Sequence, residues 1–200
     1  MNHYLTQNAK MRRSSGPRTF AFGIPAYRSS SGFVTCPAAG ECARACYARR
    51  NHYTFSVVKR AQETRLELTQ SEDFVPVISR EIERRRIESV RIHDSGDFYS
   101  PKYLNKWLAV MARHPDVRFY SYTKRVALMK RYREEGRLPA NFTVIYSYGG
   151  TEDRLIERDN DRHSFIFKTQ DEATAQGYCD ASRDDAMATG SNHRVGLVFH

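Results

Sequence analysis

The stretch that decides the fold is VRFYSYTKRVALMKRYREEGRLPANFTVIYSYGG, residues 117–150. It begins with a run of β-branched and aromatic residues, which predicts a strand over 117–124. An amphipathic segment closed by Gly136 follows and predicts a helix, because glycine commonly ends a helix. A second apolar run predicts another strand over 142–150. A strand, a helix and a strand at this spacing indicate a βαβ unit with parallel strands.

The same alternation continues on both sides of this unit. Further short apolar runs predict strands at 18–26, 89–98, 164–168 and 194–200, which makes six strands. Helices are predicted between them at 54–70, 71–86, 100–115, 125–137, 151–161 and 171–179. This order predicts an α/β fold with a parallel sheet, either open and doubly wound or curled into a partial barrel.

One domain accounts for the length. The 200 residues, of which 40% are apolar, are enough for one hydrophobic core. Residues 1–16 are polar and basic without apolar periodicity, so a flexible basic arm is expected there. Residues 17–200 are expected to form a single α/β domain.

The charge balance bears on partners and location. The chain has 32 lysine and arginine residues and 23 acidic ones, a net charge of +9. Such an excess attracts polyanions, so nucleic acid or a nucleotide is an expected partner. No apolar run approaches the length of about 18 residues that a membrane helix needs, and no export signal is evident, so a cytoplasmic protein without a membrane partner is expected. Neither a nucleophile elbow nor a Walker phosphate loop occurs, which excludes those enzyme classes.

Polar and reactive residues gather at the predicted ends of the strands. Parallel α/β folds bind ligands where the chain leaves the C-terminal ends of their strands. In chain order these ends carry Cys36, Cys42 and Cys46, Asp94–Phe98, Tyr122–Lys124, Ser147–Gly150, Lys168 and His200. The sequence therefore predicts a site at this edge of the sheet.

The cysteines indicate a metal centre. Cys36, Cys42 and Cys46 lie within eleven positions, and disulfides are unfavourable in a reducing compartment. Structural zinc sites favour two separate pairs of cysteines, whereas three thiols from one loop suit a [4Fe-4S] cluster that leaves one iron for another ligand. Cys179 is a candidate for that fourth position, and zinc held by all four cysteines is the alternative.

These features resemble the radical S-adenosylmethionine (SAM) superfamily. The resemblance rests on the loop TCPAAGECARACYARR (35–50), the repeated strand-helix units and the tip Ser95-Gly96-Asp97 after the second strand. It implies a partial (β/α)6 barrel, a cluster on the three loop cysteines and SAM bound at that tip. Gly96 allows a close backbone approach, and the Asp97 carboxylate suits an ammonium group.

The same resemblance implies a pocket above the strand ends. Tyr122, Lys124 and Ser147 are expected to line the part that takes the adenosine or the substrate. The segments TCPAAGECARACYA, RIHDSGDF and YSYTK also resemble a phage- and plasmid-borne family of the gene product eighty-eight type, over roughly residues 18–170. That second resemblance implies a phage protein in the host cytoplasm and no particular substrate.

Three further candidates lie at the same edge. The tyrosine pairs within 120–122 and 146–148 could stack on a base, or their rings could cover the core while their hydroxyl groups contact water. His93 could transfer a proton, bind a metal or form part of the core. The turn Gly149-Gly150 precedes a predicted helix and could hold an anion.

The leading hypothesis is an iron-sulfur, radical-SAM-like enzyme that generates a radical on a nucleotide or nucleic-acid substrate. The alternative is a non-catalytic nucleic-acid-binding protein stabilised by zinc or a cluster on all four cysteines. The fourth ligand distinguishes the two. An open position beside Asp97 favours catalysis, and Cys179 on the metal favours a closed structural site.

Overall fold

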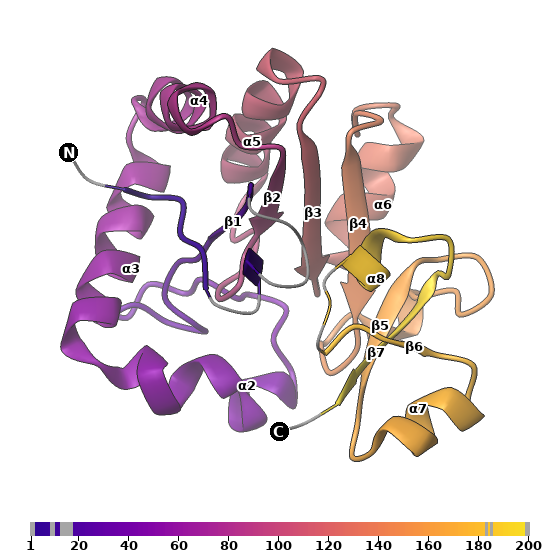
Figure 1. The fold of residues 1–200 in the computed structure, drawn as a ribbon. Coiled ribbons are helices and arrows are strands. Elements are labelled where there is room, and N and C mark those ends of the chain that lie inside the picture. Colours follow the sequence, from indigo (N-terminus) through magenta and orange to yellow (C-terminus); the bar gives the residue numbers. More distant parts are fainter. Residues whose placement is uncertain (1–2, 9–10, 13–17, 183, 185, 199–200) are drawn as a thin grey trace.

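The computed structural model describes residues 3–8, 11–12, 18–182, 184 and 186–198. In this part of the chain seven parallel strands form one sheet that curls into a half-barrel, in the order β1-β2-β3-β4-β5-β7-β6 (Figure 1). The strands are β1 (Thr19–Phe22), β2 (Ser89–Ile92), β3 (Arg118–Thr123), β4 (Phe142–Ser147), β5 (His163–Phe167), β6 (Cys179–Asp180) and β7 (Arg194–Val198). The predicted α/β fold with parallel strands is confirmed.

Helices and short helical turns connect the strands. The α-helices are α2 (Cys42–Ala45), α3 (Ser56–Gln70), α4 (Phe74–Arg85), α5 (Pro101–Arg113), α6 (Val126–Glu134), α7 (Gln170–Ala175) and α8 (Ala186–Thr189). The 3-10 turns are η1 (Tyr47–Arg49), η2 (Asn51–Thr54) and η3 (Asp153–Leu155). Within the described residues, none of these helices combines the length and the apolar character needed to cross a bilayer.

The described residues form seven strands rather than the six predicted. The additional strand, β6, begins at Cys179 in a segment that was expected to be helical over 171–179. The helix ends early because Gly177 takes a positive φ of 77° and turns the chain toward the sheet. A strand of two residues is too short to produce an alternating pattern in the sequence.

Local sequence signals predicted some helix ends correctly and others wrongly. The hydroxyl of Ser100 accepts a hydrogen bond of 3.2 Å from the backbone of Tyr103, with Pro101 in the first helical position. Ser71, expected to cap α4, instead ends α3 while its hydroxyl accepts from the backbone of Asp73. The helix predicted over 151–161 is reduced to the turn η3.

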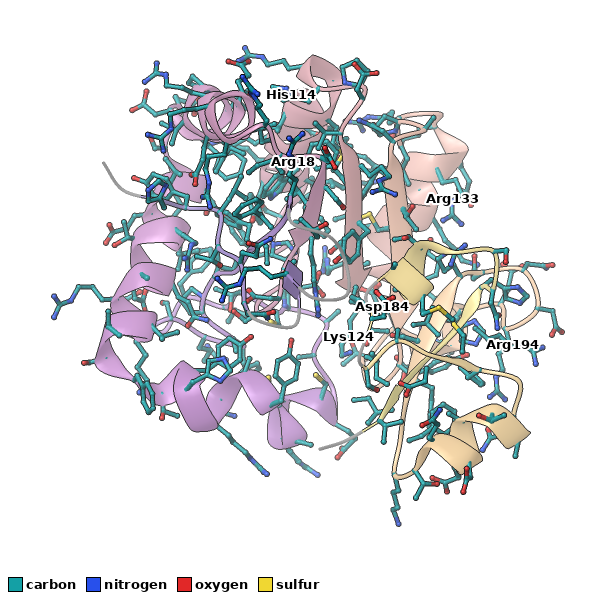
Figure 2. The ribbon with its side chains drawn as sticks, viewed as in Figure 1. Arg18, His114, Lys124, Arg133, Asp184 and Arg194 are labelled. Atoms are coloured by element: carbon teal, nitrogen blue, oxygen red, sulfur yellow. The ribbon has the colours of Figure 1, made fainter. Side chains whose placement is uncertain are left out.

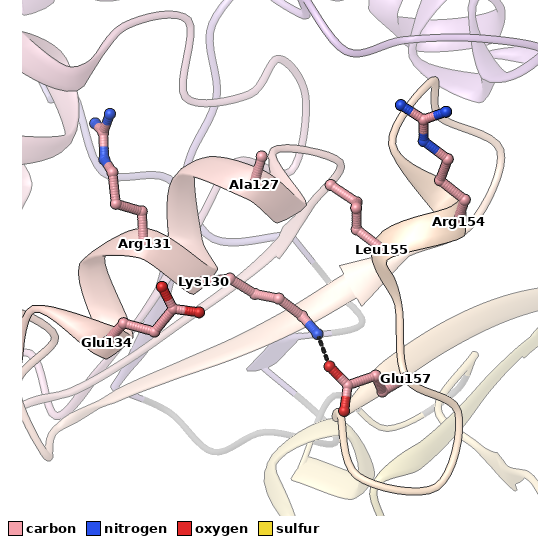
Figure 3. A pocket seen from close by; sticks show the side chains of 7 residues that line it. All are labelled: Ala127, Lys130, Arg131, Glu134, Arg154, Leu155 and Glu157. Carbon is pink, nitrogen blue, oxygen red and sulfur yellow. Dashed lines mark hydrogen bonds and ion pairs between the residues drawn. The ribbon is translucent and has the colours of Figure 1, made fainter.

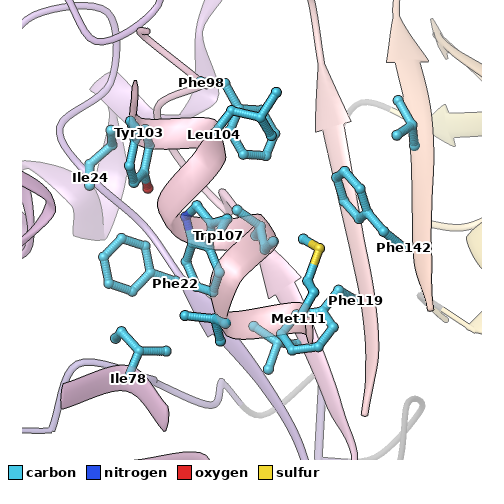
Figure 4. Packing of buried hydrophobic residues seen from close by; sticks show 14 of the residues in the cluster. Phe22, Ile24, Ile78, Phe98, Tyr103, Leu104, Trp107, Met111, Phe119 and Phe142 are labelled. Atoms are coloured by element: carbon cyan, nitrogen blue, oxygen red, sulfur yellow. The ribbon is translucent and has the colours of Figure 1, made fainter. Parts of the chain in front are cut away.

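The main core lies between the sheet and helices α3, α4, α5 and α6 (Figure 1). Trp107 of α5 is fully buried at its centre, with ring centroids 5.3 Å from Phe22 and 5.1 Å from Phe74 (Figure 4). Such edge-to-face pairs add about 0.5–1.5 kcal/mol each to the stabilisation from burial. This packing holds β1 and β2 against the helices and therefore fixes where their C-terminal ends lie.

A smaller core lies on the concave face of the half-barrel. Successive residues of a strand point to opposite faces, so Phe119 faces the main core while Tyr120 faces the concave side. There Tyr120 and Ile145 pack against Val195 and against Ala188 of α8. The concave face of the described chain is thus partly filled by α8.

The described part of the predicted arm is attached to the domain. Thr6 exchanges two backbone hydrogen bonds with Ala21, of 2.8 and 2.7 Å, and so extends the edge of β1. Leu5 is 1% exposed, and its backbone N–H donates to Glu81. The rest of the predicted arm, at 1–2, 9–10 and 13–16, lies outside the described residues, as does His200.

Candidate functional site

The cysteine-bearing loop after β1 docks on the tip of β4, at the C-terminal edge of the sheet. The backbone N–H groups of Gly40 and Cys42 donate to the carbonyl of Gly149 at 3.2 and 3.0 Å. In return, the N–H of Thr151 donates to the carbonyl of Ala38 at 2.9 Å. Two segments about a hundred residues apart in the sequence are thus joined by backbone hydrogen bonds.

Glycines permit this contact. A Cβ on Gly150 would lie 2.9 Å from the carbonyl oxygen of Ala38 and 3.0 Å from the Cβ of Lys124. Gly149 adopts a positive φ of 97°. Their N–H groups, predicted as an anion site, both donate to the Asp153 carboxylate at 2.8 Å. The turn is therefore occupied by a side chain of the protein itself.

The three loop cysteines influence one another electrostatically. The thiol of Cys46 donates a hydrogen bond to Cys42, which lowers the pKa of Cys42 and raises that of Cys46. Burial, and next the nearby charge of Asp97, raise the pKa of Cys36 to about 12. The Cys36 sulfur accepts a hydrogen bond of 3.3 Å from the backbone of Tyr27. The structure thus brings together the three cysteines that the sequence singled out.

Lys124 supplies a positive charge beside this group. Its ammonium donates to Ser147 Oγ at 2.8 Å and to the carbonyl oxygens of Ser147 and Tyr148 at 3.3 and 3.0 Å. The positive charge of Lys124 also lowers the pKa of the Cys42 thiol further. Lys124 directly follows the end of β3 and lies near the centre of the view in Figure 2. Lys124 and Ser147 therefore lie together at the ends of β3 and β4, near Cys42.

Asp97 is a buried joint between strands. Its carboxylate accepts hydrogen bonds from Thr123 Oγ1 at 2.6 Å and from the backbone N–H groups of Phe98 and Lys124 at 2.7 and 2.9 Å. The residue is 4% exposed, and burial raises its pKa. Its own N–H donates to the carbonyl of Thr35, next to Cys36. Asp97 thus lies close to the cysteines, and both of its carboxylate oxygens accept hydrogen bonds from groups within the protein.

The other two residues of this tip hold the end of β1. Ser95 Oγ donates to the carbonyl of Ile24 at 2.7 Å and accepts from Gln62 at 2.8 Å. Gly96 has a φ of 82°, and a Cβ there would lie 2.2 Å from the side chain of Ile24. The close approach that Gly96 permits in this structure is to Ile24.

Cys179 and Tyr122 lie on the concave face instead. The Cys179 sulfur is 3.3 Å from the carbonyl oxygen of Arg194 and 3.6 Å from that of Met187. Both Cys179 and Tyr122 pack against the small core around Tyr120. The arrangement of the described chain therefore separates Cys179, on β6, from the loop on β4 that holds the other three cysteines.

Two other candidates also lie elsewhere. His93 is 3% exposed, hydrogen-bonds Tyr103 at 3.0 Å and has a pKa lowered to about 3 by burial. It is a neutral core residue in this structure, with a φ of 68°. Lys168 is exposed at the end of β5, and its backbone N–H donates a hydrogen bond to Glu172.

The sequence placed Asp94 at the end of the second strand, but it did not predict the contacts of Asp94 with Tyr47 and Tyr53. The hydroxyl of Tyr47 donates to the carbonyl of Asp94, and the Tyr53 hydroxyl is 3.4 Å from the Asp94 carboxylate. These contacts attach the segment after Cys46 to the tip of β2. The only available signal was that Tyr47 directly follows Cys46 in the sequence.

The fold and the site together define an α/β half-barrel protein with a three-cysteine loop at the C-terminal edge of its sheet. A family model described as Gene product 88 matches residues 3–198, so the chain belongs to this family. The predicted resemblance to the phage family is thereby confirmed. No solved structure matches the chain.

Two curated relatives come from mycobacterial phages. The chain is 31% identical to the Gene 88 protein of Mycobacterium phage L5 over 138 residues, which are 64% of this chain and 56% of the relative. It is 28% identical to the Gene 88 protein of Mycobacterium phage D29 over 115 residues, 52% of this chain and 47% of the relative. The chain thus spans about half the length of the curated relatives that it matches.

Proposed function

We propose that this protein is an iron-sulfur enzyme whose cluster is held by Cys36, Cys42 and Cys46. The observation that carries the proposal is the convergence of three sulfurs from one loop beside Lys124, at the edge of a parallel sheet where such folds bind ligands. Three cysteines leave one iron of a [4Fe-4S] cluster for another ligand. The position of Cys179 on a different strand supports a three-cysteine site over one closed by all four.

The donor set suits such a group in its chemistry. Burial raises the pKa of Cys36, and the hydrogen bond to Cys42 together with burial raises that of Cys46, so both thiols are protonated, whereas bound metal cations favour the thiolate form. Within the described residues, no group of three or more His, Cys, Asp or Glu side chains is already spaced to coordinate a metal ion. The proposal therefore requires the flexible side chains of one loop to rearrange when metal binds.

Several residues of the chain would serve the bound cluster. A cluster with an open iron supplies an electron to a ligand there, and the resemblance to radical SAM proteins makes SAM that ligand. Lys124, held by Ser147, stabilises the thiolate of Cys42. Ser95 and Gly96 fix the end of β1, from which the loop departs.

The role that the resemblance implies for Asp97 does not fit. Its carboxylate already accepts three internal hydrogen bonds, so it is not available to an ammonium group. Asp97 therefore positions the loop of Cys36 and the backbone of Lys124. SAM as the ligand rests on the resemblance, and a nucleotide or nucleic-acid substrate rests on the net charge of +9.

Metal analysis of matched cysteine variants tests the proposal. The protein is purified anaerobically and reconstituted with iron and sulfide, and we expect about four irons per chain with absorbance near 400 nm, as for thiolate-bound clusters. Cys42→Ala should lose the iron, whereas the control Cys179→Ala should retain it. Tight zinc without that absorbance, or equal loss of iron in both variants, would support the four-cysteine alternative. A visible spectrum unchanged by SAM would contradict SAM as the ligand.

A further inference from the structure

A basic segment without acidic residues follows directly from the cysteine loop. From Cys42 to Gln62 the chain contains no aspartate or glutamate and five basic residues, Arg44, Arg49, Arg50, Lys59 and Arg60. All five are exposed. The segment comprises α2, the turns η1 and η2 and the start of α3, and its ribbon runs from α2, which follows the cysteine loop, to α3 (Figure 1).

Ion pairs with other described residues hardly neutralise this charge. Arg44 forms an ion pair of 3.3 Å with Glu41, in which both side chains are at least 80% exposed, and such pairs are weak. None of the other four basic residues forms an ion pair with a described residue. The guanidinium of Arg49 donates to the carbonyl of Ala43 and lies 5.7 Å from the ring centroid of Tyr27. Arg49 is thus held in place with its charge uncompensated.

Exposed rings lie among these cations. Tyr47 is 51% exposed and Phe55 is 60% exposed, although large aromatic side chains are usually more buried. The hydroxyl of Tyr47 is held by Asp94, and its ring packs edge-on against Tyr53 at 5.7 Å. The Tyr47 ring is therefore held in place by these contacts while 51% of the residue stays exposed.

We propose that residues 42–62 bind single-stranded nucleic acid. The arginines contact phosphates, and Tyr47 and Phe55 stack on unpaired bases, the combination by which proteins hold single strands. A duplex does not offer the faces of its bases to such rings. A bound single strand would be the substrate of the proposed enzyme, so its role as substrate rests on that proposed function. Binding of the strand itself does not require a cluster.

A second basic surface, a groove between α6 and η3, is less suited to bind phosphate. A groove of about 410 Å³ between α6 and η3 is lined by Lys130, Arg131 and Arg154, together with Glu134 and Glu157 among others (Figure 3). Lys130 is hydrogen-bonded to Glu157 inside it. Because the two glutamates offset most of the positive charge, this groove is a poor phosphate site, and it provides matched control residues.

The experiment measures the fluorescence anisotropy of labelled oligonucleotides about 20 nucleotides long, a length that exceeds typical single-strand site sizes. Arg44→Gln/Arg50→Gln should lower the affinity for a single strand by about 10- to 30-fold at 0.1 M salt and reduce the salt slope by about 1.4. The control Arg131→Gln/Arg154→Gln removes the same charge elsewhere and should bind like the wild type. Equal losses in the two double variants would refute the proposal.

A second pair of variants separates stacking from apolar burial. Phe55→Ala should weaken binding by about 5- to 100-fold, as expected for loss of one stacked base, while Val57→Ala at the neighbouring exposed position should have no effect. Binding of a duplex as tightly as of a single strand would overturn the proposal. So would a preference for vesicles containing phosphatidylserine over the oligonucleotide, since that result would assign the surface to a membrane.

The design keeps the two proposals distinguishable. Ribo- and deoxyribo-oligonucleotides of one sequence identify which strand is preferred. Cys36→Ala removes a proposed iron ligand that lies outside residues 42–62, so this variant should lose iron and is expected to keep its affinity for the single strand. Binding of single strands by a protein that never binds iron would support the proposed strand-binding surface and refute the proposed enzyme. Binding of iron without binding of single strands would refute the strand-binding surface alone.

Discussion

Replacing Asp97 by asparagine tests whether the tip of β2 is a structural joint. The Asp97 carboxylate joins the tip of β2 to the end of β3 through Thr123 and Lys124, and it also accepts from the adjacent N–H of Phe98. Asparagine has nearly the same shape, but one of its two terminal atoms is a donor. That NH₂ group would face the N–H of Lys124 or the donors on the other side, so at least one buried hydrogen bond is lost.

The expected cost follows from these contacts. A buried donor left without its acceptor costs about 1–3 kcal/mol, so Asp97→Asn should lower the free energy of unfolding by about 2 kcal/mol. Asp97→Ala leaves all three donors without partners and should cost about 3–5 kcal/mol. The burial that raises the pKa of Asp97 offsets part of the gain from its hydrogen bonds, which keeps the estimate at this level. For a chain of this size, 2 kcal/mol corresponds to a decrease in Tm of about 4–8 °C.

Urea unfolding followed by tryptophan fluorescence measures this change, since the single tryptophan, Trp107, is fully buried. The matched control is Asp94→Asn in the same tip, where the side chain is partly exposed and the hydrogen bond from Tyr53 is long, at 3.4 Å. We expect a loss below about 1 kcal/mol for the control. If Asp97→Asn costs no more than Asp94→Asn, the carboxylate is not a structural joint and a ligand-binding role regains support.

Three further predictions concern the site and the core. Gly150→Ala should cost about 1–3 kcal/mol and make the loop thiols react faster with a thiol reagent, because its Cβ would meet Ala38 at 2.9 Å; Gly190→Ala, with no atom closer than 3.6 Å, is the control. His93 has a pKa lowered to about 3, so its contribution to stability is complete above its ordinary pKa of 6.5 and is lost as the pH falls toward 3. Unfolding in urea at pH 7 and pH 5 should show a loss of about 2 kcal/mol that His93→Asn, which tolerates positive φ, largely removes; an identical pH dependence in the variant would contradict this. Ser100→Ala should lower the unfolding free energy by about 0.5–2 kcal/mol, and no change would mean that the cap on α5 is not needed.

The order of strands and helices was readable in the sequence because it depends on local patterns. The alternation around 117–150 produced the βαβ unit, and the serine-proline pair before α5 marked the start of that helix. The positions of the cysteines at a strand end followed from the same alternation. Periodicity and capping act over a few residues, so the sequence expresses them directly.

The site itself was decided by contacts between distant segments. The sequence placed Cys36 and Asp97 at strand ends. Only the folded chain shows that the Asp97 carboxylate accepts hydrogen bonds from the end of β3. The additional strand that carries Cys179, and its position beyond β7, also depend on pairing across the sheet. The sequence alone determined which elements form and which residues reach the edge of the sheet. Tertiary structure decided which of those residues meet, because burial and partners are properties of the packed chain rather than of any one segment.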